Sequence, residues 1–345
     1  MGFWQRLVYG RKNRFSEAEA RSYIETILRD RRRLFTGAYR LERFSDGTDQ
    51  GVYRLEYDGA PPRVIRFHRL RRDERAEHFF RVHEYLGRLG LPIPAILYAD
   101  RSPEVKRRWG VEVSLEQWIE GTHFDGPCRE DPAVVRRLAQ LLARFHAVKS
   151  PAHGLPWKPV HRPPYGVVLM NRIRHCYARI VKTSGLVDRT EAGRHVAWFE
   201  RWCQRLGAIA EYNLLHGDLH GQNVIIAPDG KVHALDFIAT HFGYFERDLA
   251  VCARTLVARS SFRHELFFAE YFRIAGPDAA RRYQAHQPFF TAQVCLEMVY
   301  SSTVKAWRID RGLKHQTGPY ASEAKKFLEI LRQTIEASPD PAAGA

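Results

Sequence analysis

The sequence lacks the features of a disulfide-stabilised, zinc-binding or membrane-spanning protein. Its five cysteines are scattered and form no C-x-x-C pair: Cys128, Cys176, Cys203, Cys252 and Cys295. We therefore expect neither a disulfide framework nor a structural zinc site. No stretch is apolar over the length needed to cross a bilayer, and no signal-peptide pattern is present. These absences favour a cytosolic protein with free thiols.

Acidic residues are also few relative to basic ones. The chain has 54 Lys and Arg against 39 Asp and Glu, which gives a formal net charge of +15. Two interpretations stay open: attraction to an anionic partner (a phosphosugar, lipopolysaccharide, a phospholipid surface or nucleic acid), or solvated charge without a partner. The excess of positive charge argues against a polycationic acceptor. We see no specific nucleic-acid site.

The first fourteen residues mix aromatic and basic side chains. A basic amphipathic segment of this kind can lie on a membrane surface. We favour packing of this short arm on the protein body. A peripheral position at the inner membrane face stays open as the alternative.

The most informative stretch is residues 214–237, LLHGDLHGQNVIIAPDGKVHALDF. Its pattern predicts a strand, a polar loop, a strand, a turn, a further strand and then an acid. Phosphoryl transfer needs a carboxylate aimed at the attacking hydroxyl and oxygen ligands for Mg²⁺. Asp218 suits the first role, and Asn223 and Asp236 suit the second. The stretch therefore predicts a phosphotransferase site.

The segment HGDLHGQN at 216–223, followed by Asp236-Phe237, resembles the aminoglycoside phosphotransferase and choline kinase superfamily. The resemblance implies an α+β, bilobal protein-kinase-like fold with a small antiparallel-sheet N-lobe and a mainly helical C-lobe. The boundaries we expect are a helical extension over 1–36, the N-lobe over 37–118, the C-lobe over 119–337 and a disordered tail over 338–345.

The same resemblance assigns residues that would bind the nucleotide. Gly47 and Thr48 lie in the loop that would cover its phosphates. Arg66 stands where protein kinases place a phosphate-holding lysine, since arginine also supplies a permanent charge and two-pronged hydrogen bonding. Glu84 would fix Arg66, with Glu77 as the rival acid.

The remaining assignments concern the adenine site, the catalytic loop and the acceptor. Backbone groups of Gln117 and Ile119 would bind adenine, and His216 and Asp248 would support the catalytic loop. The last helices would form the acceptor wall, with three candidate side chains: Glu297, Tyr300 and Trp307.

Hydrophobic periodicity predicts the elements around this site. We expect a helix that begins at Ser16, a hairpin over 39–57, a strand over 63–67, a helix over 73–89 and a strand over 110–115. In the larger lobe we expect a Pro- and Gly-rich loop over 151–166 and seven helices: 134–148, 168–185, 190–210, 248–259, 262–274, 277–307 and 320–336.

The function we expect is Mg²⁺-dependent transfer of the γ-phosphate of ATP, or of GTP, to a hydroxyl of a small molecule or glycan. A lipopolysaccharide or sugar kinase, a protein Ser/Thr kinase, and a non-catalytic nucleotide-binding protein of the same fold are the alternatives.

Overall fold

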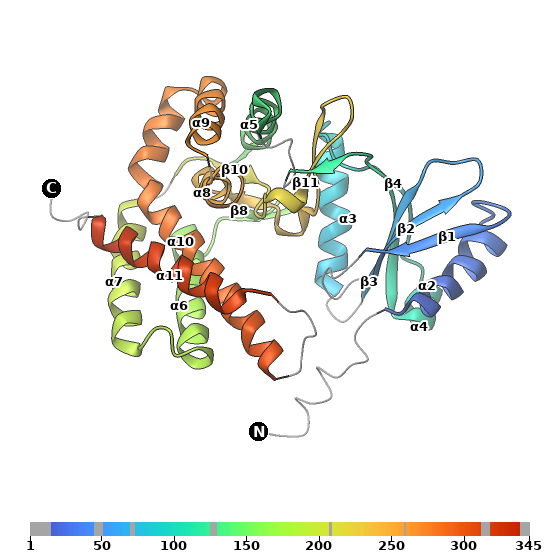
Figure 1. Ribbon diagram of the computed structural model, residues 1–345, viewed down its shortest axis with the longest axis horizontal. Helices are drawn as coiled ribbons and strands as arrows, with labels where there is room; N and C mark the ends of the chain where they lie inside the picture. The colour runs from blue at the N-terminus through green and yellow to red at the C-terminus, as the bar shows by residue number, and fades with distance from the viewer. Residues whose placement is uncertain are drawn as a thin grey trace. The chain divides into compact units, whose positions relative to one another are not determined.

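The computed structural model describes residues 15–44, 51–69, 73–124, 130–206, 209–258, 260–311 and 318–338 (Figure 1). The chain divides into two compact units. Unit 1 contains the residues up to Thr122 together with 227–229 and 233–238, and unit 2 contains the rest. The arm over 1–14, and the expected tail apart from Ser338, lie outside the described residues.

Unit 1 is built on a five-stranded antiparallel sheet with the order β1-β2-β3-β5-β4. Its strands are β1 (Tyr39–Arg43), β2 (Gly51–Tyr57), β3 (Arg63–Arg69), β4 (Ile96–Asp100) and β5 (Val111–Gln117). Its helices are α2 (Glu17–Tyr23), the π-helical continuation η2 (Ile24–Arg31), α3 (Asp73–Arg88) and α4 (Pro103–Trp109).

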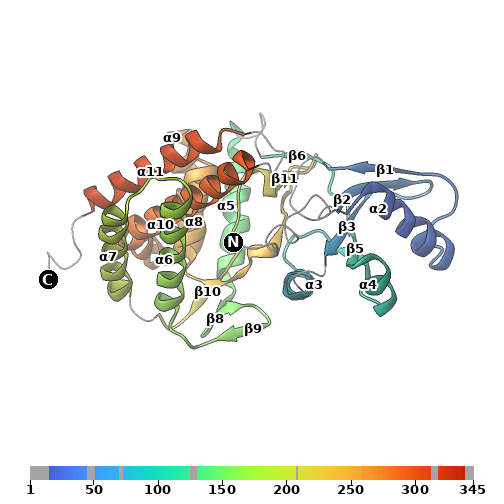
Figure 2. The same cartoon turned by 90° about the horizontal axis from the view of Figure 1, so that it is seen from below.

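The first helix begins where the sequence predicts, at a capping box. The Ser16 hydroxyl accepts from the Glu19 N–H, and the Glu19 carboxylate accepts from the Ser16 N–H. This exchange satisfies two donors that a helix start otherwise leaves unpaired. The apolar side of α2 and η2 then joins the core cluster on the sheet. The α3 helix lies on the opposite face of that sheet (Figure 2).

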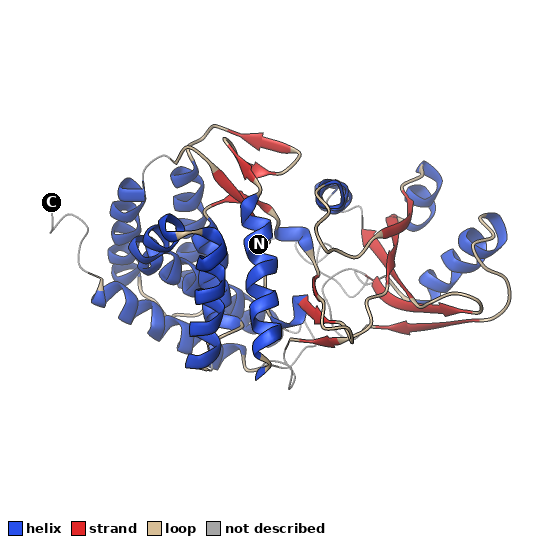
Figure 3. Ribbon diagram, turned by 90° about the horizontal axis from the view of Figure 1, so that it is seen from above, coloured by secondary structure: helices blue, strands red, loops and turns tan. Residues whose placement is uncertain are grey.

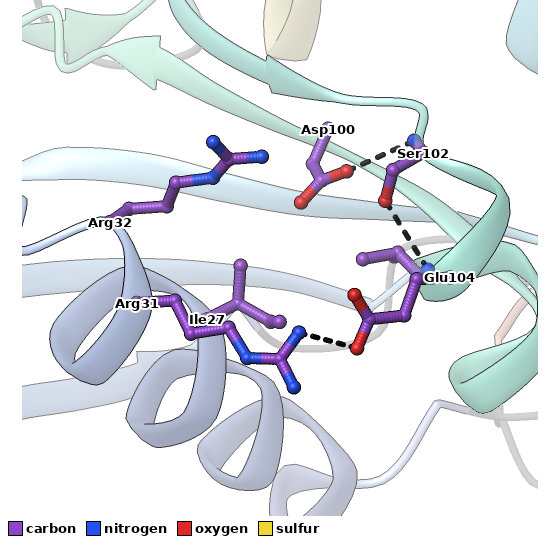
Figure 4. Close-up of a pocket in the computed structure, with 7 residues that line it drawn as sticks. Ile27, Arg31, Arg32, Asp100, Ser102 and Glu104 are labelled. Atoms are coloured by element: carbon purple, nitrogen blue, oxygen red, sulfur yellow. Dashed lines mark hydrogen bonds and ion pairs between the residues drawn. The ribbon is translucent and has the colours of Figure 1, made fainter.

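Polar contacts fix the N-terminal helices to the corner between β4 and α4. Figure 4 shows the small hollow at this corner, where Arg31 donates to Glu104 and the Ser102 N–H donates to Asp100. The Tyr23 hydroxyl also donates to Asp100, at 3.3 Å. Residues 15–36 are thus part of the core of unit 1.

Unit 2 is mainly helical, as Figure 3 shows. Its helices are α5 (Pro132–Ala147), α6 (Tyr165–Thr183), α7 (Arg189–Leu206), α8 (Phe245–Thr255), α9 (Ser261–Ala275), α10 (Pro277–Asp310) and α11 (Tyr320–Ala337). The prediction of an antiparallel-sheet N-terminal part and a helical C-terminal part is confirmed. Within the described residues, no helix has the length and apolar character to span a membrane.

Short strands frame the catalytic segment. A second sheet has the order β7-β10-β13-β8-β9. Its strands are β7 (Lys149–Ser150), β8 (His153–Leu155), β9 (Lys158–Val160), β10 (Tyr212–Leu215) and β13 (His241–Gly243). A third sheet has the order β12-β11-β6. It contains β6 (Thr122–His123), β11 (Val224–Ile226) and β12 (Val232–Ala234), with the 3₁₀ turns η5 (Gly221–Asn223) and η6 (Phe237–Ala239) nearby in the chain.

Two expected elements differ from the structure. The stretch 151–166, expected as a loop, contains β8 and β9, which pair with each other in antiparallel register. The sequence predicts a loop here because the stretch is rich in proline and glycine, residues that usually mark turns. Helix α8 begins at Phe245 rather than at Asp248. Asp248 therefore lies in the first turn of that helix, where its carboxylate accepts hydrogen bonds from the backbone N–H groups of His216 and Gly217.

Candidate active site

The loop over residues 216–223 of unit 2, which the sequence predicts to be the catalytic loop, is held by the buried carboxylate of Asp248. It accepts hydrogen bonds from the N–H groups of His216 at 2.7 Å and of Gly217 at 3.0 Å. His146 Nε2 lies 3.4 Å from the same carboxylate, and the other ring nitrogen lies 2.7 Å from the Tyr271 hydroxyl. Since a buried carboxylate needs several such partners, this arrangement fixes the loop backbone and keeps the charge compensated.

The electrostatics of Asp248 follow from this setting. Burial raises its pKa, but the hydrogen bond and charge of His146, together with the charges of Arg247 and His216, lower the pKa to about 2. The carboxylate is therefore ionised at neutral pH. Its negative charge faces the backbone N–H groups that begin the loop.

Gly217 occupies a position that only glycine can take. Its φ is +84°, in the left-handed region, and a Cβ added there would collide with the Ala239 carbonyl group. The Gly217 carbonyl in turn accepts from Arg247 Nη1 at 2.8 Å. Thus both polar groups of this residue are bound to α8, and the loop turns sharply into Asp218.

The side chains of Asp218 and Asn223 in this loop differ in their exposure to solvent. The Asp218 side chain is 52% exposed, whereas Asn223 is buried. The Asn223 amide nitrogen donates to the Asp218 carbonyl at 2.9 Å. Because that nitrogen is engaged inside the loop, the Asn223 amide oxygen is the atom suited to a cation.

Sequence reasoning missed a role for His220 and for Arg247. His220 Nε2 lies 3.2 Å from the Asn223 amide nitrogen and 3.8 Å from the Asp218 carboxylate. Arg247 bridges from Gly217 to Glu297 of α10, with 2.7 Å between Nη2 and the carboxylate. The sequence held one signal for Arg247, its position next to Asp248, because a neighbouring cation commonly compensates the charge of a buried acid.

Of the expected acceptor-wall residues, Glu297 is engaged by two arginines. Arg172 Nε lies 3.6 Å from its carboxylate, in addition to the Arg247 contact. Burial raises the pKa of Glu297, but the charges of Arg247 and Arg172 lower it overall. The Arg172 guanidinium also lies over the Tyr300 ring, 5.1 Å from its centroid.

Unit 1 contributes a second group of candidate residues around Arg66. Arg66 Nε donates to Glu116 of β5 at 3.0 Å, and Nη2 lies 3.4 Å from the other carboxylate oxygen. Burial lowers the pKa of Arg66, but the charges of Glu116 and Asp236 raise it overall. Asp236 has a left-handed backbone, with φ of +58°, two residues after the end of the strand β12. Arg66 and Asp236 are thus electrostatically coupled within unit 1.

The expected pairing of Arg66 with Glu84 is wrong. Glu84 is 57% exposed at its side chain and pairs with Arg88 on the same helix. The rival acid Glu77 pairs with Arg81 and Arg101. At 100° per residue, the face of α3 that packs on the sheet carries Phe79 and His83, so Glu84 points to solvent.

His83 takes the inward position beside this pair. It is 6% exposed and packs on Phe79, with 4.3 Å between ring centroids, and on Phe237, with 5.6 Å. Burial lowers its pKa to about 4, with a further lowering from Arg66 that Glu116 opposes. His83 is therefore a neutral imidazole at neutral pH.

The structure describes only some of the residues that we assigned to nucleotide binding. Gly47 and Thr48 lie outside the described residues. The Gln117 N–H donates to the Ala95 carbonyl at 2.8 Å, so it is used within unit 1. Adenine binding by the other backbone groups of Gln117 and Ile119 stays a prediction.

The candidate oxygen ligands suit Mg²⁺ that is bound together with nucleotide phosphates. They suit a metal ion with ligands from the protein alone less well. In the described part of the chain, no cluster of three or more His, Cys, Asp or Glu could hold a metal ion. Magnesium in nucleotide sites usually takes one or two protein oxygens, with phosphates and water completing the shell. The Asn223 amide oxygen and the Asp236 carboxylate are oxygens of that kind.

An antiparallel-sheet unit followed by a helical unit with this loop defines the class of kinase-like phosphotransferases, enzymes that act on hydroxyl groups. Residues 40–285 match the model of the phosphotransferase enzyme family (APH), and the chain belongs to that family. A search among curated protein sequences found no match.

Solved structures agree with the fold. Aminoglycoside phosphotransferase APH(4)-Ia aligns with a TM-score of 0.63 at 17% identity, over 92% of this chain and 98% of that one. Ethanolamine kinase from Plasmodium vivax aligns with a TM-score of 0.65 at 13% identity, over 92% and 91% of the two chains. The protein-kinase-like fold expected from the sequence is confirmed.

We predict that Gly217→Ala destabilises the protein by about 2 kcal/mol or more, because a methyl group there needs both a strained backbone and displacement of Ala239. Thermal unfolding measures this. Gly193→Ala is the matched control, since that position lies in helix α7 with nothing within 4 Å of an added Cβ. Equal melting temperatures for the two variants would contradict the account of the loop.

We also predict a pH dependence from His83. The unfolded chain binds a proton at this imidazole near pH 6.5, whereas the folded protein binds it only near pH 4. Stability is therefore fully present above pH 6.5 and falls as the pH is lowered towards 4, by about 3 kcal/mol for this one group. Urea unfolding at several pH values should show that His83→Asn loses less stability over this range. His161→Asn, at an exposed position, should retain the wild-type slope.

Proposed function

We propose that this protein transfers the γ-phosphate of ATP or GTP to a hydroxyl group of a small molecule or glycan, with Mg²⁺. The observation that carries the proposal is the loop geometry of unit 2. Asp248 fixes the backbone before Asp218, and Asn223 fixes the backbone at Asp218 itself. The Asp218 carboxylate is thereby presented to solvent on a rigid support, as a general base requires.

The step we propose is in-line displacement. The acceptor hydroxyl oxygen forms a bond to the γ-phosphorus, the bond between that phosphorus and the β,γ-bridging oxygen breaks, and Asp218 takes the hydroxyl proton. Asn223 and Asp236 would hold Mg²⁺, which neutralises the phosphate charge when bound. Arg66 would bind the nucleotide phosphates, and the backbone of Gln117 and Ile119 the adenine.

Relatives support a nucleotide and a small hydroxyl acceptor. Thermostable mutants of APH(4)-Ia were solved as ternary complexes with AMP-PNP and hygromycin B and with ADP and hygromycin B. The similar Plasmodium vivax protein is an ethanolamine kinase. Since sequence identity to these proteins is below 20%, the likeness supports the reaction class and leaves the acceptor to the local chemistry of this chain.

The local charge favours a neutral or anionic acceptor. Glu297, the acid we expected on the acceptor wall, is neutralised by Arg247 and Arg172. Arg172, with 46% of its side chain exposed, presents positive charge beside Tyr300. A sugar or a phosphate-bearing glycan suits this wall better than a polycation, in keeping with the net charge of +15.

Asp218→Asn should lower turnover by about 10³-fold or more, because the asparagine amide cannot accept the proton of the acceptor hydroxyl. Nucleotide affinity should stay unchanged, since Asp218 contacts the acceptor rather than ATP in our proposal. Phosphate transfer to a panel of hydroxyl compounds, and calorimetry with Mg-ATP, measure the two quantities. Turnover at the wild-type rate in this variant would refute the proposal.

Arg172→Gln should lower kcat/KM for phosphate-bearing sugar acceptors about 5- to 10-fold, the effect of about 1 kcal/mol from one exposed charge. Neutral sugars should change less than twofold. Arg174→Gln is the matched control on the same helix, where the arginine pairs with Glu200 and should affect neither class. A polycationic aminoglycoside as the best acceptor would contradict this choice of substrate.

A further inference from the structure

Strand alternation places a row of polar side chains on one face of the unit 1 sheet. Successive side chains point to opposite faces of a strand. Ile65 and Phe67 therefore join the core cluster with the N-terminal helices. Arg66 takes the other face, the one that α3 covers, and so does Glu116 of the neighbouring strand.

The pairing register brings these side chains into contact. Arg66 stands opposite Ser114, and Val64 stands opposite Glu116. Arg66 and Glu116 are therefore diagonal neighbours across two strands, a separation that long side chains span. The observed Nε to Oε1 distance of 3.0 Å follows from that register.

Glu116 is itself fixed by the sheet. The Ser114 hydroxyl donates to its Oε1 at 2.7 Å, and His68 Nε2 lies 3.0 Å from that hydroxyl. His68, Ser114 and Glu116 are all less than 5% exposed. A buried carboxylate with two partners in fixed positions has little freedom, so it can hold the Arg66 guanidinium in one orientation.

The described part of α3 supplies no acid to Arg66. What it places there is the Phe79 ring, 5.4 Å from the guanidinium carbon, and the neutral imidazole of His83 nearby. Glu84, the acid that the family resemblance assigned to Arg66, faces solvent. Glu116 of β5 compensates the buried cation through an ion pair, with 3.0 Å between Arg66 Nε and Oε1.

We propose that Glu116 is the positioning residue for Arg66, and that it sets the guanidinium on the nucleotide phosphates from within the sheet. This inference rests on the proposed function, since it concerns the same nucleotide. Because both residues belong to paired strands, the register of the sheet contributes directly to the orientation of the cation. Glu116 acts through Arg66 and does not itself contact the reacting atoms.

The test compares three glutamate-to-glutamine variants. Glu116→Gln should weaken Mg-ATP binding, and raise KM for ATP, about 10-fold or more, because a neutral amide holds Arg66 less firmly. Glu112→Gln is the matched control. It lies on the same face of β5, its side chain is only 3% exposed, and it pairs with Arg101 and Lys106 instead. Glu84→Gln controls for a helix-borne acid. Both controls should bind Mg-ATP within twofold of wild type.

A double-mutant cycle identifies the route. Arg66→Gln should weaken nucleotide binding, and adding Glu116→Gln to it should weaken binding little further, because Glu116 acts through that arginine. Should Glu116→Gln fail to fold by circular dichroism, Glu116→Asp takes its place. Aspartate retains the charge but is one methylene too short, so the same loss of affinity is expected.

Two results would overturn the inference. One is equal ATP affinity in the Glu116 variant and the Glu112 control, and the other is a loss of affinity in Glu84→Gln. Failure of the proposed function would look different, because wild-type protein would then neither bind Mg-ATP nor transfer phosphate.

Discussion

The hydrogen bonds from two consecutive backbone N–H groups to the buried Asp248 carboxylate are the constraint on which the catalytic loop depends. They fix the backbone of His216 and Gly217 without using any side chain of the loop. The left-handed Gly217 then turns the chain, and Arg247 holds its carbonyl. An exposed aspartate on a flexible loop would lose much of its value as a base, since orientation accounts for a large part of catalysis. The buried anion thus converts a polar loop into a fixed support.

Unit 1 also holds a buried charge in place, the cation of Arg66, but it does so with side chains rather than with backbone N–H groups. The Arg66 guanidinium is held by Glu116 from the adjacent strand, and Glu116 by Ser114. In both units a buried charge is compensated by a partner of opposite sign or by backbone donors, and each functional group extends from that compensated pair. Burial makes these pairs costly to break, because removal of one partner leaves the other charge unsatisfied.

Sequence reasoning succeeded where the signal was local and failed where it depended on which face a side chain takes. The capping box at Ser16, the strand-loop-strand pattern around Asp218 and the family resemblance could be read from neighbouring residues. The pairing of Arg66 could not, because it requires the register between β3 and β5. The pattern Val-Glu-Val-Ser-Leu-Glu over 111–116 did contain the information that Glu116 shares a face with Ser114. Sequence reasoning did not predict β8 and β9, because strands of three residues leave no periodic signal.

The sequence by itself determined the class of chemistry. Asp218, Asn223 and Asp236 follow one another at spacings that suit phosphoryl transfer, so residue type and order along the chain are enough to predict their roles. Tertiary structure alone decided which partners hold those groups. Asp248 reaches back about thirty residues to the loop, Arg247 reaches α10, and Glu116 reaches Arg66 across fifty residues of chain. Such pairs depend on strand register and helix rotation. A shift of one residue in strand register would exchange the buried face for the exposed one, and a shift of one residue along a helix would turn each side chain by about 100°.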